Sequence, residues 1–291
     1  MNPRTPNERV ERAVYGVLGH EIGYSLSPKI FRTVFDALEW PAVYALFDRR
    51  PAEVPRFVSA AATLGILGLN VTKPFKVSIV AYMDRLDDSA RCTGAVNTIR
   101  FEGRRSTGYN TDIAGVIAAL KPHAARLRGQ TALILGAGGA ARAVALTLER
   151  TFRMRRLTFA VRSRRAGERM IDSFATAAEP SAILETIPYE ADPIRDRLNH
   201  CALLVNATPT GTSGPASGSP LPRGVKLTAE TLVFDLVYQP RETALLKLAV
   251  RSGCRAVGGW PMLVAQAEES FRIWTGRRFP VSSRRKLMMW K

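Results

Sequence analysis

Residues 131–150 read TALILGAGGAARAVALTLER, and this stretch decides the fold. An apolar strand pattern runs directly into a glycine-rich turn, and good helix formers follow it. Glycines let the backbone turn tightly and approach a phosphate, while the first helical turn offers free N–H groups and a partial positive charge. The stretch therefore predicts a nucleotide-binding unit, with a merely structural glycine turn as the alternative. The residues expected at the pyrophosphate are Gly136, Ala137, Gly138, Gly139 and Ala140.

The next strand pattern, residues 157–161, ends in the basic turn Arg162-Ser163-Arg164-Arg165. A Rossmann-like unit that binds NAD carries an acidic residue near this point, where it holds the ribose 2′-hydroxyl. A carboxylate would repel a 2′-phosphate, whereas a guanidinium pairs with it. We therefore expect NADP(H), bound through Arg162, Ser163 and Arg165. Solvated surface arginines are the alternative, and the turn leaves the choice between Arg164 and Arg165 open.

Strand and helix patterns alternate on both sides of this unit, which favours open, largely parallel sheets. Upstream, apolar runs at residues 13–19, 42–48 and 66–72 are typical of strands, and a hairpin is expected around Gly103. Downstream, the alternation continues to about residue 258.

We predict an α/β fold of two domains, with the active site in the cleft between them. An open, mostly parallel α/β substrate domain is expected over residues 1–111, completed by C-terminal helices over residues 259–291. A Rossmann-like NADP-binding domain is expected over residues 112–258.

Composition excludes several other classes of protein. With 291 residues, 46% hydrophobic and 23% charged, the chain has the usage of an ordinary globular protein. It contains no run of about 18 apolar residues that could span a membrane, and its first residues, MNPRTPNERVER, lack the apolar segment of a secretory signal. The three cysteines are far apart and form no CxxC pair, so neither a disulfide framework nor a metal site is expected. These features predict a cytoplasmic protein.

The formal net charge of +17 comes mostly from arginine, with 34 Arg against 8 Lys. The arginines are scattered along the chain, so a solvated basic surface is the simplest interpretation. We expect no specific nucleic-acid partner and no membrane attachment. A basic nucleic-acid-binding or regulatory protein that keeps the fold is the alternative from another class.

Residues 70–76, NVTKPFK, follow an apolar strand pattern, and Asp112 in GYNTD begins a helical pattern. A lysine and an aspartate that meet in a cleft can share a proton, and reduction of a carbonyl by hydride needs a proton donor. Spacing alone does not show that Lys76 meets Asp112. A nucleic-acid-binding descendant of such an enzyme would be expected to lose this pair, and both residues are present.

These motifs resemble those of the shikimate dehydrogenase family, over about residues 15–276. Eight of them occur in the family's order: SLSP at 25–28, NVTKPFK at 70–76, GAVNT at 94–98, NTD at 110–112, GAGGA at 136–140, NAT at 206–208, DLVY at 235–238 and MLVAQ at 262–266. The resemblance implies reversible, NADPH-dependent reduction of 3-dehydroshikimate to shikimate, in the chorismate pathway to the aromatic amino acids. A quinate/shikimate or aminoshikimate dehydrogenase is the alternative, and the sequence leaves monomer and homodimer open.

The resemblance also implies roles for single residues. Lys76 matches the catalytic lysine, paired with Asp112, and Leu236 and Gly259 are expected to flank the nicotinamide. The residues implied in substrate binding are Ser25, Ser27 and Tyr238 at the carboxylate, and Thr72, Asn97, Asp112 and Gln266 at the ring hydroxyls.

Several positions depart from the family pattern. Tyr24 stands where a histidine is usual, and it is expected to flank the site without lining it. Trp260 and Pro261 replace smaller residues beside the expected nicotinamide position, and Val161 replaces an asparagine before Arg162.

Overall fold

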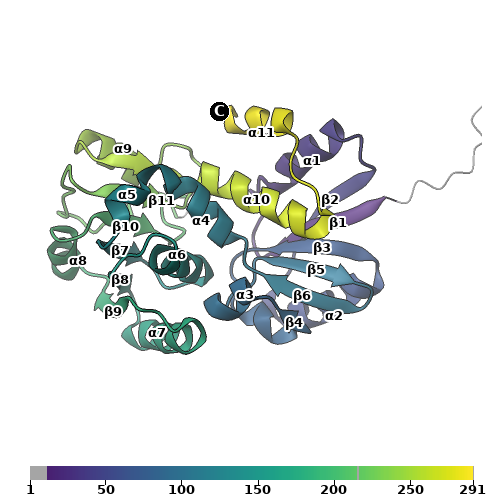
Figure 1. Ribbon diagram of the computed structural model, residues 1–291, viewed down its shortest axis with the longest axis horizontal. Coiled ribbons are helices and arrows are strands. Elements are labelled where there is room, and N and C mark those ends of the chain that lie inside the picture. Colours follow the sequence, from purple (N-terminus) through teal and green to yellow (C-terminus); the bar gives the residue numbers. More distant parts are fainter. Residues whose placement is uncertain (1–11, 215, 291) are drawn as a thin grey trace, which may run out of the picture.

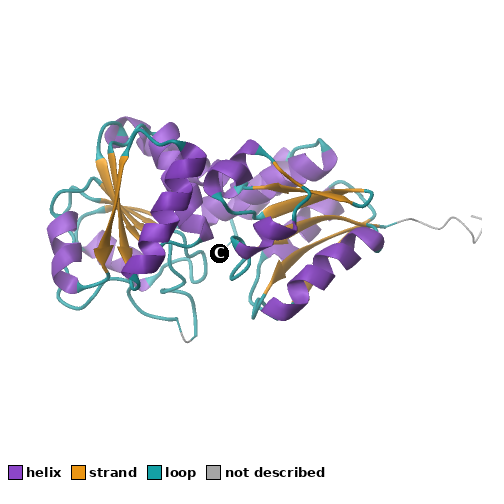
Figure 2. Cartoon of the chain, turned by 90° about the horizontal axis from the view of Figure 1, so that it is seen from below, coloured by secondary structure: helices purple, strands orange, loops and turns teal. Residues whose placement is uncertain are grey.

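Two six-stranded sheets lie side by side along the long axis of the molecule (Figure 1). Helices cover both faces of each sheet (Figure 2). The computed structural model describes residues 12–214 and 216–290. Residues 1–11 of the expected substrate domain, Pro215 and Lys291 therefore lie outside the described residues. The predicted α/β class is confirmed.

The first sheet has the strand order β2-β1-β3-β5-β6-β4 and is mostly parallel, as predicted. Strand β5 runs against its neighbours β3 and β6, and the turn at Gly103 joins β5 to β6 as the expected hairpin. The strands are β1 (Ala13–Gly19), β2 (Ala42–Asp48), β3 (Ile66–Val71), β4 (Arg85–Leu86), β5 (Thr98–Glu102) and β6 (Arg105–Tyr109). The helices are α1 (Ser27–Ala37), η1 (Pro51–Glu53), α2 (Val54–Thr63), η2 (Ser78–Tyr82) and α3 (Asp88–Thr93).

Helix α1 shows how the local sequence builds this layer. Pro28 stands in its first turn, where the fixed φ of proline suits a helix and its missing N–H is not needed. Ile30, Val34 and Phe35 follow at helical spacing and are buried against the sheet. The start of α1 is thereby fixed at Ser27, beside the site described below.

The second sheet is parallel throughout its described strands and has the order β12-β11-β10-β7-β8-β9. The order reverses between β7 and β10, and ligands of such sheets bind at the carboxyl ends of the strands at this switch point. The strands are β7 (Thr131–Leu135), β8 (Arg156–Val161), β9 (Ile183–Pro188), β10 (Leu203–Asn206), β11 (Leu232–Asp235) and β12 (Arg255–Val257). The helices are η3 (Lys121–His123), α5 (Ala124–Leu127), α6 (Gly139–Arg150), α7 (Arg164–Ala178), α8 (Ala191–Leu198) and α9 (Ala244–Arg251).

Helices α4 (Asp112–Leu120) and α10 (Trp260–Thr275) pack against each other between the two sheets. Met262 of α10 belongs to the apolar core of the second sheet, whereas Val264 and Phe271 belong to the core of the first. Helix α11 (Val281–Met288) then covers α10 and α1. The packed pair of helices α4 and α10 therefore joins the two sheets.

Candidate active site

Two cavities meet between the sheets. The larger, a cleft of about 400 Å³, is lined by the first turn of α6 and by the segments that follow β3, β10 and β11. The smaller, of about 150 Å³, lies against α4 and α10. Lys76, Leu236 and Tyr238 line both cavities, so the two spaces share a boundary at these side chains.

The smaller cavity collects the residues that the sequence implied for substrate binding. They come from segments far apart in the chain, and hydroxyl and amide groups predominate among them. They are Ser25, Ser27, Thr72, Asn97, Asp112, Tyr238 and Gln266. Such a lining suits a small ring acid with several hydroxyl groups, because neutral donors and acceptors match each hydroxyl.

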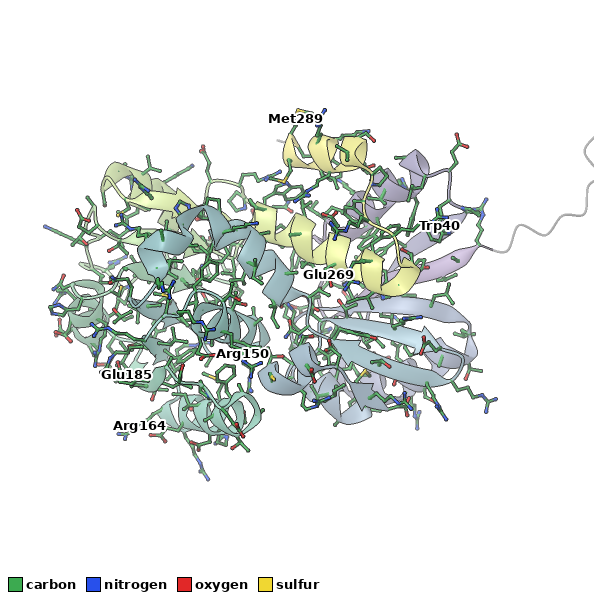
Figure 3. All side chains as sticks on the ribbon, viewed as in Figure 1. Trp40, Arg150, Arg164, Glu185, Glu269 and Met289 are labelled. Carbon is green, nitrogen blue, oxygen red and sulfur yellow. The ribbon has the colours of Figure 1, made fainter. Side chains whose placement is uncertain are left out.

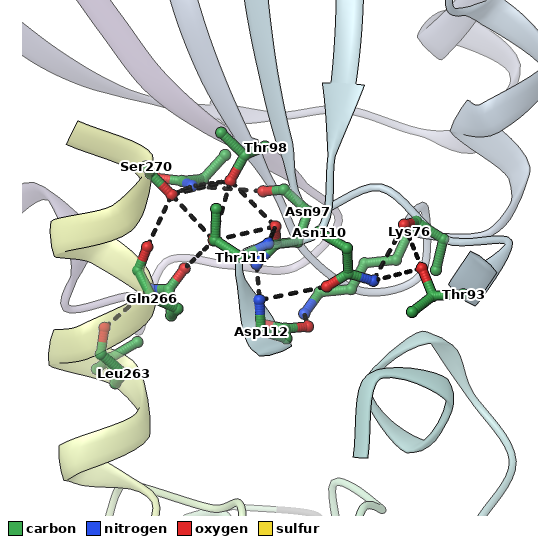
Figure 4. A network of polar contacts seen from close by, with 12 residues as sticks. Lys76, Thr93, Asn97, Thr98, Asn110, Thr111, Asp112, Leu263, Gln266 and Ser270 are labelled. Carbon is green, nitrogen blue, oxygen red and sulfur yellow. Dashed lines mark hydrogen bonds and ion pairs between the residues drawn. The ribbon is translucent and has the colours of Figure 1, made fainter. Parts of the chain in front are cut away.

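Lys76 and Asp112 meet in this cavity (Figure 4). The Lys76 Nζ lies 2.5 Å from Asp112 Oδ2, and the two side chains are 19% and 5% exposed. The second carboxylate oxygen, Oδ1, accepts a hydrogen bond of 2.8 Å from Asn97 Nδ2. Because both oxygens are held, the carboxylate fixes the ammonium group at the boundary between the two cavities.

A network of buried polar groups holds the Asn97 side chain in place (Figure 4). Its Oδ1 accepts a hydrogen bond of 2.7 Å from the Thr111 backbone N–H. The Thr98 hydroxyl lies 3.0 Å from the same oxygen and 2.8 Å from Ser270 Oγ, which accepts from Asn70 Nδ2 at 2.8 Å. Sequence reasoning gave these supporting residues no role, although Asn70, Thr98 and Thr111 stand in its motifs and Ser270 lies one helical turn beyond Gln266.

The glycine turn of α6 forms one wall of the larger cleft. Gly136 has a φ of +97°, which glycine adopts readily, and its N–H donates to Ala160 O at 2.9 Å. Gly138 caps α6 without a side-chain hydrogen bond, and a β-carbon at Gly138 would meet nothing within 4 Å. The free N–H groups of the first helical turn and the open space beside them fit a dinucleotide pyrophosphate.

The first turn of α6 also packs directly on Lys76. A β-carbon placed at Gly139 would lie 2.7 Å from the Lys76 Cβ. This close approach brings the expected cofactor-binding turn against the expected catalytic side chain. A residue larger than glycine would push the two apart.

The basic turn lies at the same edge of the second sheet. Leu135 pairs with Ala160, so Arg162, just beyond the end of β8, follows the strand beside the glycine turn. Ser163 caps α7 by accepting from the Ala166 N–H at 3.3 Å. The larger cleft and this turn are separate, and Arg162, Ser163 and Arg165 are exposed.

Arg164 is engaged elsewhere on α7. Its Nε donates to Glu168 Oε1 at 2.7 Å, and the side chain projects at the outer edge of the molecule (Figure 3). Because the two side chains of this ion pair are 86% and 49% exposed, the pair does not prevent Arg164 from meeting a phosphate, and Arg164 and Arg165 both stay candidates for the second contact.

A buried carboxylate fixes the turn that carries Leu236 and Tyr238. Asp235 is fully buried and accepts hydrogen bonds from Asn206 Nδ2 at 2.8 Å, Thr243 Oγ1 at 2.6 Å and the Val237 N–H at 3.1 Å. Burial raises the pKa of the Asp235 carboxyl above its ordinary value, although these hydrogen bonds oppose the shift.

The raised pKa of Asp235 predicts a pH-dependent effect of Asp235→Asn. The folded protein binds the Asp235 proton more tightly than the unfolded chain, so the wild type loses stability from this residue as pH rises from 3.8 through the raised pKa. Asparagine does not titrate. We expect the melting temperature of Asp235→Asn, relative to the wild type, to increase as the pH is raised above about 4. A difference that stays constant with pH would contradict the assignment.

Gly259 permits a contact that no other residue allows. A β-carbon there would collide with Leu236 O and lie 2.9 Å from Val237 O, both backbone atoms. Gly259→Ala is therefore expected to lower the free energy of unfolding by about 3 kcal/mol. Chemical denaturation measures this. The control is Gly23→Ala, where a β-carbon meets nothing within 4 Å, and an equal loss in both variants would refute the expectation.

Comparison with known proteins identifies the family. Residues 17–99 match the shikimate dehydrogenase substrate binding domain, and residues 259–289 match the shikimate 5′-dehydrogenase C-terminal domain. The shikimate dehydrogenase (NADP+) of Symbiobacterium thermophilum is 38% identical over 281 residues, which are 97% of this chain and 95% of that protein. The chain belongs to the shikimate dehydrogenase family. The resemblance inferred from the motifs is thus confirmed.

Solved structures of the shikimate dehydrogenase family share the fold over nearly the whole chain. A shikimate dehydrogenase in complex with NADP+ has a TM-score of 0.84 at 31% identity and covers 99% of this chain and 98% of its own. Quinate dehydrogenase from Corynebacterium glutamicum in complex with NAD has a TM-score of 0.83 at 29% identity, over 96% of this chain and 99% of its own.

Two departures from the shikimate dehydrogenase pattern are explained by the structure. The expectation that Tyr24 only flanks the site is wrong, because Tyr24 lines both cavities, with Lys73 Nζ 5.0 Å from its ring centroid. The Trp260 ring packs beneath α11. Its Nε1 donates to Leu287 O at 3.0 Å, and the Arg241 guanidinium lies 3.7 Å above the ring. The bulk of Trp260 is therefore directed to α11.

Two further features bear on the class of protein. Over residues 12–214 and 216–290, no helix is both long and apolar enough to cross a membrane. Within the same ranges, no three His, Cys, Asp or Glu side chains gather as they would around a metal ion.

Proposed function

We propose that this protein is an NADP-dependent shikimate dehydrogenase. It reduces the ring ketone of 3-dehydroshikimate to the alcohol of shikimate and catalyses the reverse reaction, in the chorismate pathway. The observation that carries the proposal is the Lys76–Asp112 pair at the boundary between the two cavities. Membership of the shikimate dehydrogenase family and the name of the relative, which includes NADP+, support it.

Bound NADP(H) would supply or accept a hydride at the ring carbon. The open glycine turn and the uncapped start of α6 fit this cofactor. The residues proposed to hold it are Gly136, Ala137, Gly138, Gly139 and Ala140 at the pyrophosphate, Arg162, Ser163 and Arg165 at the 2′-phosphate, and Leu236 and Gly259 at the nicotinamide.

Lys76 carries the proton chemistry of the proposed reaction. In its ammonium form Lys76 donates a proton to the alkoxide oxygen that develops on reduction, and it takes the proton back in the oxidation. Asp112 holds the ammonium in position at 2.5 Å and would accept a hydrogen bond from a ring hydroxyl, while Asn97 keeps the carboxylate from turning. This arrangement acts most strongly on the transition state, where the oxygen becomes negative.

The remaining polar groups of the smaller cavity would orient the substrate. The hydroxyls of Ser25, Ser27 and Tyr238 are proposed to bind the carboxylate. Thr72, Asn97 and Gln266 are proposed to bind the ring hydroxyls with Asp112. Holding every polar group of the ring fixes the reacting carbon toward the larger cleft.

Initial rates with shikimate and quinate, each with NADP+ and with NAD+, test the proposal. We expect rapid turnover with shikimate and NADP+, which Lys76→Ala abolishes. Turnover with quinate or with NAD+ would favour a quinate/shikimate or aminoshikimate dehydrogenase, an alternative that the similar fold of a quinate dehydrogenase supports. Absence of turnover in every combination would overturn the proposal.

The domain division and the setting of the enzyme are part of the proposal. Residues 1–111 and 259–291 would form the substrate domain, and residues 112–258 the NADP domain. The free thiols of Cys92, Cys201 and Cys254 favour a reducing compartment, hence the cytoplasm. Light scattering would distinguish monomer from homodimer, and filter binding at rising salt would reveal any specific affinity for nucleic acid.

A further inference from the structure

Arg142 on α6 is a buried cation without an acidic partner in the described part of the chain. It is 8% exposed, although arginine is rarely buried unless a carboxylate pairs with it. Its Nη1 donates to Ser173 Oγ at 2.9 Å and to Thr93 O at 3.3 Å. Its Nε has no acceptor among the described residues. Such a charge costs stability, which indicates that Arg142 contributes something other than stability at this position.

The contacts of Arg142 join the two sheets. Ser173 lies on α7, beside the second sheet, whereas Thr93 is the last residue of α3, beside the first. The last carbonyls of a helix carry a partial negative charge, so Thr93 O is a suitable acceptor for a guanidinium. Arg142 therefore ties the carboxyl end of α3 to both α6 and α7.

From Thr93 the hydrogen bonds continue to the catalytic pair (Figure 4). The Thr93 hydroxyl accepts from Asn110 Nδ2 at 2.9 Å, and Asn110 Oδ1 accepts from the Asp112 N–H at 3.2 Å. Arg142 itself lies one helical turn after Gly139, the first residue of α6. A continuous chain of contacts thus runs from the expected cofactor-binding turn to the start of α4, where Asp112 stands.

We propose that Arg142 is a positioning residue that couples the cofactor-binding end of α6 to Asp112. The Arg142 Nη1 reaches Ser173 and Thr93 together only while α3, α6 and α7 keep their present spacing, so it ties the two sheets at this point. Through Thr93 and Asn110 it sets the position of the Asp112 backbone, and hence of Lys76. The link to catalysis rests on the function proposed above.

Arg142→Met and Arg142→Lys test the coupling by kinetics. Methionine keeps much of the apolar stem, and we expect kcat to fall by about tenfold while the dissociation constant for NADP+ changes by less than about twofold. Lysine, which retains the charge, should restore most of kcat. The matched control is Arg150→Met, since Arg150 also lies on α6 and donates to α7, at Ala178 O, 2.9 Å away (Figure 3). Equal kcat in Arg142→Met and the wild type would overturn the proposal.

Hydrogen exchange of the protein without ligands gives a readout that does not depend on activity. We expect faster exchange at residues 110–112 in Arg142→Met and in Thr93→Val, and no change there in Arg150→Met. Should Arg142→Met fail to fold, Thr93→Val and Arg142→Lys still decide the matter. Unchanged exchange at these residues in Thr93→Val would refute the route through Thr93. If the wild type does not oxidise shikimate but exchange responds as expected, the proposed function fails and the coupling stands.

Discussion

Lys76→Met is expected to lower kcat for shikimate oxidation by about 10³-fold, while the KM for shikimate changes by less than about threefold. In the proposed reaction Lys76 would donate a proton to the reacting oxygen. This interaction would strengthen as the oxygen becomes charged, so its loss should act on turnover more than on binding. Steady-state rates at saturating NADP+ measure both constants.

The choice of methionine follows from the packing of Lys76. The Lys76 Cβ faces the first turn of α6, where a β-carbon at Gly139 would lie only 2.7 Å away. Because there is no room for a branched side chain at this contact, the replacement for lysine should be unbranched, as methionine is. Removing the ammonium leaves Asp112, which is 5% exposed, without its ion-pair partner, and the melting temperature should be recorded alongside the rates. Lys247→Met, on the exposed surface of α9, is the control. A folded Lys76→Met enzyme that keeps more than about a tenth of the wild-type kcat would exclude Lys76 as the proton donor.

Arg162→Asp is expected to lower kcat/KM for NADP+ by about 100-fold and to leave kcat/KM for NAD+ unchanged or higher. A hydrogen bond to a charged group is worth about 1.5–3 kcal/mol, and the introduced carboxylate adds repulsion toward the 2′-phosphate. NAD+ lacks that phosphate, so it experiences neither effect.

A matched control separates the local effect from the change in net charge. Arg56→Asp alters the total charge by the same amount on the exposed face of α2, in the layer of the first sheet and away from the basic turn. Both variants should be compared at one ionic strength, because salt screens exposed charges. Equal losses for NADP+ in the two variants would show that Arg162 does not select the cofactor.

The fold and much of the candidate site could be predicted from the sequence because their signals are local. The order of apolar strand, glycine turn and helix at residues 131–150 specifies a βαβ unit by backbone geometry alone. Alternating strand and helix patterns on either side predict the remaining layers. The hairpin predicted around Gly103 is confirmed by the antiparallel pairing of β5 with β6. The order of the motifs then predicted the family and, through it, the residues that line the smaller cavity.

Contacts between distant segments required the tertiary structure. Lys76 and Asp112 are 36 residues apart, and their meeting depends on the order of strands in the first sheet. Tyr24 lines the cavities because the segment after β1 forms part of their wall, and Trp260 turns to α11, where Leu287 O accepts its N–H. No periodicity in the sequence encodes these neighbours.

Arg142 illustrates both what the sequence predicts and what only the tertiary structure decides. In the sequence it is one of 34 arginines, and the helix that carries it can be predicted from residues 131–150 alone. That it is buried, that α3 supplies its acceptor and that Asn110 continues the chain to Asp112 follow from the packing of the two sheets. The sequence alone determined the elements and the chemistry they carry, because hydrogen bonding within a helix or turn is local. Tertiary structure decided which groups meet, because packing joins segments that the chain keeps apart.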